Sequence, residues 1–276
     1  MKLKYSALIA GSLVVLSGCV SMQAVKDYSV YSRTTIESVN PVAKDFYGSC
    51  VRANSYKPFA VYSKCDSEQE ASKAILTVAS VLDAYGAALG ALASDELVDY
   101  SADVTKLTDE VKKLNAMDAS KVDAVGKLSS LIANAATSGY QQKEVVKFIQ
   151  ASDDSVVNIS NSLADLIDSH YSQAISLELS AWEDAYKRVE RVERDSKPLE
   201  WEAYSKAQWQ QRSDLHAKLS ATKALAKSIR GIGQTHHKLK QDAEKITGKE
   251  VYASVRTFVD AAKPVIKDVQ EAFSKK

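Results

Sequence analysis

The feature that most constrains the fold is the spacing of apolar residues in the second half of the chain. From Tyr140 to Lys197 the sequence contains neither glycine nor proline, and apolar residues recur three or four positions apart. This spacing places them on one face of an α-helix, and a second stripe of the same kind follows Lys197-Pro198. The first stripe comprises Val156, Ile159, Leu163, Leu166, Tyr171, Ile175, Leu179 and Trp182; the second comprises Leu215, Leu219, Thr222, Leu225, Ile229, Ile232, His236, Leu239, Ala243 and Ile246.

Each stripe needs a partner surface, so we expect the two helices to pack as a long antiparallel hairpin across the Pro198 turn. Within the first helix, the capping residues Ser152-Asp153-Asp154-Ser155 favour the start of a new helix at that point. No segment shows the period-two alternation of strands over a useful length. The sequence therefore predicts an all-α protein, an elongated helical bundle with long antiparallel coiled-coil-like hairpins.

The run from Ala74 to Ala93 is apolar nearly throughout and is about as long as a membrane-spanning helix. It contains Gly86-x-x-x-Gly90, a spacing that lets two helices approach closely. Asp83 lies inside it, and a lone carboxylate is unfavourable in lipid. We expect the most buried helix of the bundle, with insertion into a membrane as the alternative. Shorter stripes at 104–114 and 122–131 predict a further helical hairpin.

The N-terminus carries a different pattern. Two lysines precede an apolar run, Ala7 to Leu16, which is shorter than the ~20 residues that a bilayer requires. The run leads into Leu16-Ser17-Gly18-Cys19, which resembles the lipobox of bacterial lipoproteins. The resemblance implies that residues 1–18 are a signal peptide and that Cys19 becomes the lipidated first residue of the mature protein. An ordinary N-terminal helix or secretory signal is the alternative.

The resemblance also implies a location. Two or more acyl chains, such as palmitate, anchor a protein stably, whereas one chain binds only marginally. In Gram-negative bacteria an aspartate directly after the lipidated cysteine tends to retain a lipoprotein at the inner membrane, but Val20 stands there. We therefore expect an outer-membrane lipoprotein whose body faces the periplasm, with surface display left open.

With Cys19 lipidated in an oxidising compartment, Cys50 and Cys65 remain as an even pair and predict a disulfide. A metal site is less favoured because no histidine lies near them in the sequence. A reactive thiol is less favoured because no nearby residues are arranged to make a thiolate. The stapled loop contains Tyr56, Phe59 and Tyr62. These aromatic residues either form a binding surface or pack as a small core on the helices below.

These patterns divide the chain into three segments. Residues 1–18 form the lipoprotein signal peptide. Residues 19–65 form a lipidated tether, a short helix that Pro41 ends or redirects, and the disulfide-stapled loop. Residues 66–276 form the helical bundle domain.

Motifs for catalysis or metal binding are weak. Ser220-Ala221-Thr222-Lys223 matches the S-x-x-K pattern of penicillin-recognising enzymes, but their S-D-N motif is missing. His236 and His237 are adjacent on a helix and point about 100° apart, so they cannot chelate one metal ion together. Because His236 occupies the apolar stripe, we interpret it as a hydrogen-bonded core histidine or a residue that sets the register of the helices.

Composition and the remaining aromatic residues constrain the partners. The 36 basic and 35 acidic residues give no electrostatic reason to bind nucleic acid, and no glycine-rich phosphate loop is present to hold a nucleotide. Trp182, Trp201 and Trp209 flank the hairpin turn, where they either cap its open end or form a ligand patch.

The function expected from these observations is that of a lipid-anchored periplasmic helical interaction or scaffold protein. We expect it to have no catalytic activity, cofactor or metal, and to contact the membrane through Cys19 and a protein in the periplasm. An inhibitor or toxin-immunity protein that grips its target with the Cys50–Cys65 loop is one specific form. The alternatives are a membrane-perturbing envelope protein that inserts the 74–93 helix, and a hydrolase of the cell wall or another envelope polymer.

Overall fold

The computed structural model describes residues 18–58, 62–94, 119–135, 142–243, 246 and 248–274, and every regular element among them is helical. The all-α prediction is confirmed. The predicted 104–114 helix lies outside the described residues. The elements are α1 (Gly18–Glu37), α2 (Val39–Ser55), α3 (Asp66–Ser94), α5 (Ala119–Ala135), α6 (Gln142–Asp165), the π-helical turn η2 (Leu166–Tyr171), α7 (Ser172–Glu193), α8 (Pro198–Gln241) and α9 (Lys249–Ser274).

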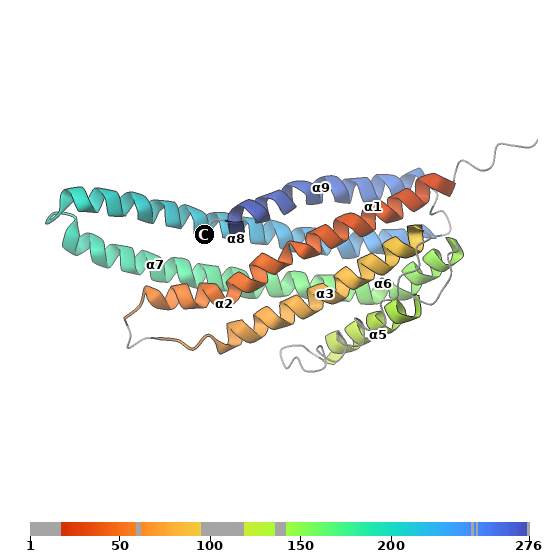
Figure 1. The fold of residues 1–276 in the computed structure, drawn as a ribbon, viewed down its shortest axis with the longest axis horizontal. Helices are drawn as coiled ribbons and strands as arrows, with labels where there is room; N and C mark the ends of the chain where they lie inside the picture. The colour runs from red at the N-terminus through yellow and green to blue at the C-terminus, as the bar shows by residue number, and fades with distance from the viewer. Residues whose placement is uncertain are drawn as a thin grey trace, which may run out of the picture.

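The molecule is elongated, and α8 runs most of its length (Figure 1). With 44 residues, α8 is ~66 Å long at 1.5 Å per residue. The continuous helix α6–η2–α7 runs back along it in the opposite direction, and both α6 and α7 pack on α8. The turn between α7 and α8 forms one end of the molecule, while α1 begins at the opposite end (Figure 1). Whether this pair has coiled-coil geometry stays a prediction.

Helices α1 and α2 belong to the same hydrophobic core as the later helices, which corrects the expectation of a tether after Cys19. Ala24, Val25 and Tyr28 of α1 are fully buried, because they lie on the face that packs on α3 and α9. The chain changes from α1 to α2 at Ser38. This break lies just before Pro41, whose ring would clash with the carbonyl four residues earlier in an uninterrupted helix.

Helix α3 packs on α1, α2, α5 and α6. By length and hydropathy it is the one helix of the described chain that could cross a membrane, and 61% of its most apolar window is buried inside the protein. The two glycines face α1: a Cβ added to Gly86 would lie 2.6 Å from Arg33 Cγ, and one added to Gly90 would lie 2.6 Å from Ser29 Oγ. The glycine spacing therefore serves a close contact between two helices within the protein.

Asp83, the charged residue within that apolar run, has a partner on α1. Arg33 Nε donates to Asp83 Oδ1 at 3.0 Å, and Ser29 Oγ donates to the carbonyl of Gly86 at 2.5 Å. The polar groups of α3 thus help to fix its register against α1.

Helix α6 passes through Ser152-Asp153-Asp154-Ser155 without a break, so the expected helix start at this point is wrong. Ser152 and Asp153 are buried instead of capping a helix in solvent. Their side chains bind groups on other helices, described below.

Candidate functional site

Cys19, the expected lipidation site, is the second residue of α1. It therefore lies at the end of the molecule where α1 begins, opposite the α7–α8 turn (Figure 1).

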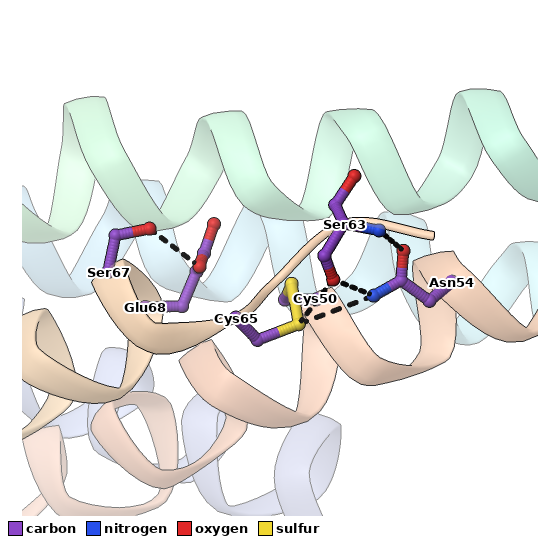
Figure 2. The surroundings of a disulfide bond; sticks show 6 residues. All are labelled: Cys50, Asn54, Ser63, Cys65, Ser67 and Glu68. Carbon is purple, nitrogen blue, oxygen red and sulfur yellow. Dashed lines mark hydrogen bonds between the residues drawn. A yellow bond between two sulfur atoms is a disulfide. The ribbon is translucent and has the colours of Figure 1, made fainter. Parts of the chain in front are cut away.

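Cys50 and Cys65 form the expected disulfide, with an S–S distance of 2.02 Å (Figure 2). Cys50 belongs to α2, which continues to Ser55, and Cys65 directly precedes α3. The first part of the predicted loop is therefore helical. Asn54 adds a second connection, because its Nδ2 donates to the carbonyl of Ser63 at 2.7 Å and its Oδ1 accepts from Ser63 N at 3.1 Å (Figure 2).

The disulfide also bears on metal binding. Cys50, Cys65 and Glu68 are close enough together to suggest a three-ligand site. A metal ion requires the thiolate form of cysteine, and here the two sulfur atoms are bonded to each other. In this oxidised state the group does not offer a thiolate site.

The three aromatic residues of the stapled loop have different surroundings. The hydroxyl of Tyr56 accepts a hydrogen bond from Gln211 Nε2 of α8, and its carbonyl accepts one from Arg188 Nη2 of α7 at 2.5 Å. Tyr56 therefore bonds the end of α2 to both helices of the hairpin. Tyr62 is 67% exposed, whereas Phe59 lies outside the described residues.

A charged cluster lies between α2 and the α7–α8 pair. Arg52 donates to both oxygens of Asp45, at 2.8 and 2.9 Å, and to both oxygens of Glu178, at 2.6 and 3.0 Å. Asp45 also accepts from Lys218 Nζ at 3.0 Å and from the hydroxyl of Tyr171 at 2.7 Å. Burial alone would raise the pKa of Asp45, but the bonds from Arg52 and Lys218 hold it below its ordinary value. The cluster fixes α2 onto the hairpin.

A second polar cluster, which we call the hub, lies in the core where α3, α6 and α8 meet. His236 Nδ1 lies 2.9 Å from Asp153 Oδ1, and its Nε2 lies 2.5 Å from the hydroxyl of Tyr85. Ser152 Oγ lies 3.0 Å from the same hydroxyl. The second oxygen of Asp153 binds His237 Nδ1 at 2.8 Å and Lys240 Nζ at 3.0 Å.

Burial lowers the pKa of His236, which favours the neutral imidazole at pH 7. The bonds then assign the tautomer: Nδ1–H donates to Asp153, and Nε2 accepts from Tyr85. Burial would raise the pKa of Asp153, but bonds from His236, His237 and Lys240 hold it well below its ordinary value. The interpretation of His236 as a hydrogen-bonded core histidine is confirmed.

The hub has the groups of an acid–base relay, namely a carboxylate, an imidazole and two hydroxyls. Ser152, Asp153, Tyr85 and His236 are, however, each at most 2% exposed. The cleft between α5 and α6 is lined by Asp154 and Ser155, among others, and not by these four residues. Their hydrogen bonds join α3, α6 and α8.

The hub residues Tyr85, Ser152 and Asp153 were not predicted as partners of His236 from the sequence. The available signal was His236 itself, because a histidine within an apolar stripe requires a buried hydrogen-bonding partner. Asp153 lies in the middle of the opposing helix, where the sequence pattern predicts the cap of a new helix. In contrast, Ser220 and Lys223 of the S-x-x-K match are both exposed on α8.

Beyond the body of the bundle, the end of the α7–α8 pair forms what we call the arm, residues 183–214. No residue of the arm is buried. Next to it Trp182 stacks on Tyr186 with ring centroids 5.5 Å apart, and Tyr186 also contacts Trp201 at 5.4 Å. Trp209 does not join this stack and is 57% exposed, with the guanidinium of Arg212 above its ring.

Two further apolar side chains of the arm are in solvent: Val192 is 68% exposed and Leu199 is 80% exposed. Two of the three tryptophans thus hold the arm together, which fits the expected cap. Val192, Leu199 and Trp209, in contrast, are exposed to solvent.

Comparison with known proteins gives no match to a family model, a curated protein or a solved structure.

Proposed function

We propose that this chain is a lipid-anchored helical interaction protein of the bacterial envelope, without catalytic activity of its own, and that the arm binds its protein partner. The observation that carries the proposal is the contrast within one helix pair. In the body, Asp153 and His236 are buried with hydrogen-bonding partners, whereas the arm leaves Val192, Leu199 and Trp209 in solvent. Tryptophan is enriched among the residues that carry most of the binding energy of protein interfaces, and burial of Val192 and Leu199 by a partner would remove apolar surface from water.

The positions of the start of α1 and of the arm at opposite ends of the molecule support the proposed lipid anchor. The lipobox-like Leu16-Ser17-Gly18-Cys19 leads directly into α1, which begins at the end opposite the arm (Figure 1). A lipid on Cys19 would hold this end at the outer membrane. The arm would then project tens of ångströms into the periplasm, since α8 alone is ~66 Å long.

An inhibitor or toxin-immunity protein is a specific form of this function. The stapled loop and the arm would act together in it, because Tyr56 connects the loop to Arg188 and Gln211. The exposed Tyr62 of the stapled loop would be a further contact for the target.

Labelling with radioactive palmitate and membrane fractionation test the anchor. We expect label on the wild-type protein and its recovery with outer membranes, and neither for Cys19→Ser. Ser21→Ala is the matched control and should be labelled normally. Label on the Cys19→Ser protein would contradict the anchor.

Photo-crosslinking in living cells tests the arm. A photoreactive amino acid at position 192, 199 or 209 should form adducts with protein. The same amino acid at the exposed body positions 30 and 252 should not. Adducts confined to the body positions would contradict the proposal.

Membrane insertion of α3 is the second candidate, favoured by its length and hydropathy. Its contacts with α1 would have to be given up first, including the Arg33–Asp83 ion pair. Leakage of vesicles on addition of the protein, with α3 becoming protected from proteolysis only in lipid, would support this candidate over the arm.

A further inference from the structure

Hydrogen bonds show how the two helices of the arm align along their length, and this alignment bears on which partner the arm can bind. Trp182 Nε1 donates to Gln208 Oε1 at 2.8 Å, and the hydroxyl of Tyr186 lies 2.9 Å from Ser205 Oγ. These contacts show which residues of α7 and α8 lie at the same level. Continued toward the turn, the same pairing places Arg191 level with Glu200, and Val192 level with Leu199.

In the part of the arm next to the turn, the two helices differ in charge. In α7 and the turn, residues 187–197 contain five basic and three acidic residues. At the start of α8, residues 198–205 contain Glu200 and Glu202 and no basic residue. Within the described part of the chain, neither of these glutamates forms an ion pair.

From this complementarity we infer that the partner of the arm is a second copy of this chain, related by a two-fold axis parallel to the arm. Such an axis places α7 of each copy beside α8 of the other, as in a four-helix bundle made from two hairpins. Arg191 then faces Glu200 of the second copy, and Val192 faces Leu199 of the second copy. Both apolar side chains leave solvent, and the basic segment of one copy meets the acidic segment of the other.

The whole arm has seven basic and eight acidic residues. This near balance gives no net attraction toward nucleic acid or anionic lipid, which require a basic surface. A balance of opposite charges favours self-association, because each charged residue then has to lie opposite a residue of the other sign on an identical surface. The parallel axis also leaves both α1 starts at the same end, so both copies can be anchored in one membrane. The inference thus rests on the proposed function and names the partner.

A charge-reversal pair tests this arrangement. Two differently tagged full-length copies are co-expressed, solubilised in mild detergent and co-purified. Wild-type copies should co-purify. Arg191→Glu in both copies, or Glu200→Arg in both, should weaken association about tenfold, because each reversal creates two like-charge contacts across the two-fold axis.

The decisive sample combines Arg191→Glu in one copy with Glu200→Arg in the other. Both intermolecular contacts are then again between opposite charges, so association should return to the wild-type level. A disturbance within the single chain would not be repaired by mixing. Arg256→Glu, a reversal at an exposed position of α9, is the matched control and should co-purify like the wild type.

Failure of wild-type copies to co-purify, equal association of all variants, or absence of rescue in the mixed sample would each overturn the inference. If the photo-crosslinks at the arm then contain a different protein, the proposed function stands and only the second copy is wrong. If the arm forms no crosslinks either, the proposed function falls with it.

Discussion

The body and the arm are built on the same helices but differ in how their side chains are used. In the body, α8 buries Ile229, Ile232 and His236, and His236 has partners at both ring nitrogens. In the arm, the same helix exposes Leu199 and Trp209. In the body, the contact between α6 and α8 is supplemented by further helices, with α2 on α7 and α9 on α8. Where α2 and α9 end, the pair continues with an uncovered surface.

Of the variants considered, Ile229→Asp should lower the free energy of unfolding of the body most. Ile229 is fully buried, so the variant loses its burial and places a carboxylate in the core, which together cost ~5 kcal/mol or more. We expect loss of the folded state by circular dichroism. A folded Ile229→Asp protein of near wild-type stability would show that α8 is not packed as described.

Asp153→Ala tests the hub. Removal of this carboxylate leaves His236, His237 and Lys240 without their shared acceptor. We expect the free energy of unfolding in urea to fall by about 3 kcal/mol, the usual effect of breaking a buried ion pair. Asp154→Ala is the matched control, since Asp154 is 92% exposed in its side chain, and should change it by less than ~0.5 kcal/mol.

The hub also shows which parts of the structure were predictable. The apolar spacing predicted the helices, because the helical period of a stripe is a local property of the sequence. The disulfide followed from an even pair of cysteines once Cys19 was set aside. The role of Asp153 depended on a histidine 83 positions later, and no local pattern connects two such residues. The burial of α1 was missed for the same reason, because its neighbours α3 and α9 are distant in the sequence.

Cys50→Ser should have an intermediate effect. A closed loop of about 15 residues contributes ~3 kcal/mol by the chain-entropy model, but the Asn54–Ser63 bonds hold the same segment in the folded state. We expect a loss of about 2 kcal/mol together with faster proteolysis between α2 and α3. Equal acceleration of proteolysis throughout the bundle would show that the disulfide supports the body as well.

Acidification should weaken the body through His236. The folded protein lowers the pKa of this residue by burial, so below about pH 6.5 the unfolded chain binds a proton that the folded chain does not. The free energy of unfolding should therefore decrease as the pH is lowered, by up to about 1.4 kcal/mol per pH unit from this group. His236→Gln should reduce that slope, and an unchanged slope would show that other groups cause it.

Leu199→Asp distinguishes a binding arm from a part of the core, because it repeats on the arm the change made at Ile229 of the same helix. We expect its free energy of unfolding to stay within ~0.5 kcal/mol of the wild type, while protein crosslinks from position 192 in cells are lost. A large loss of stability would show that the arm is part of the folded core. Unchanged stability with undiminished crosslinks would show that the arm is not the binding surface.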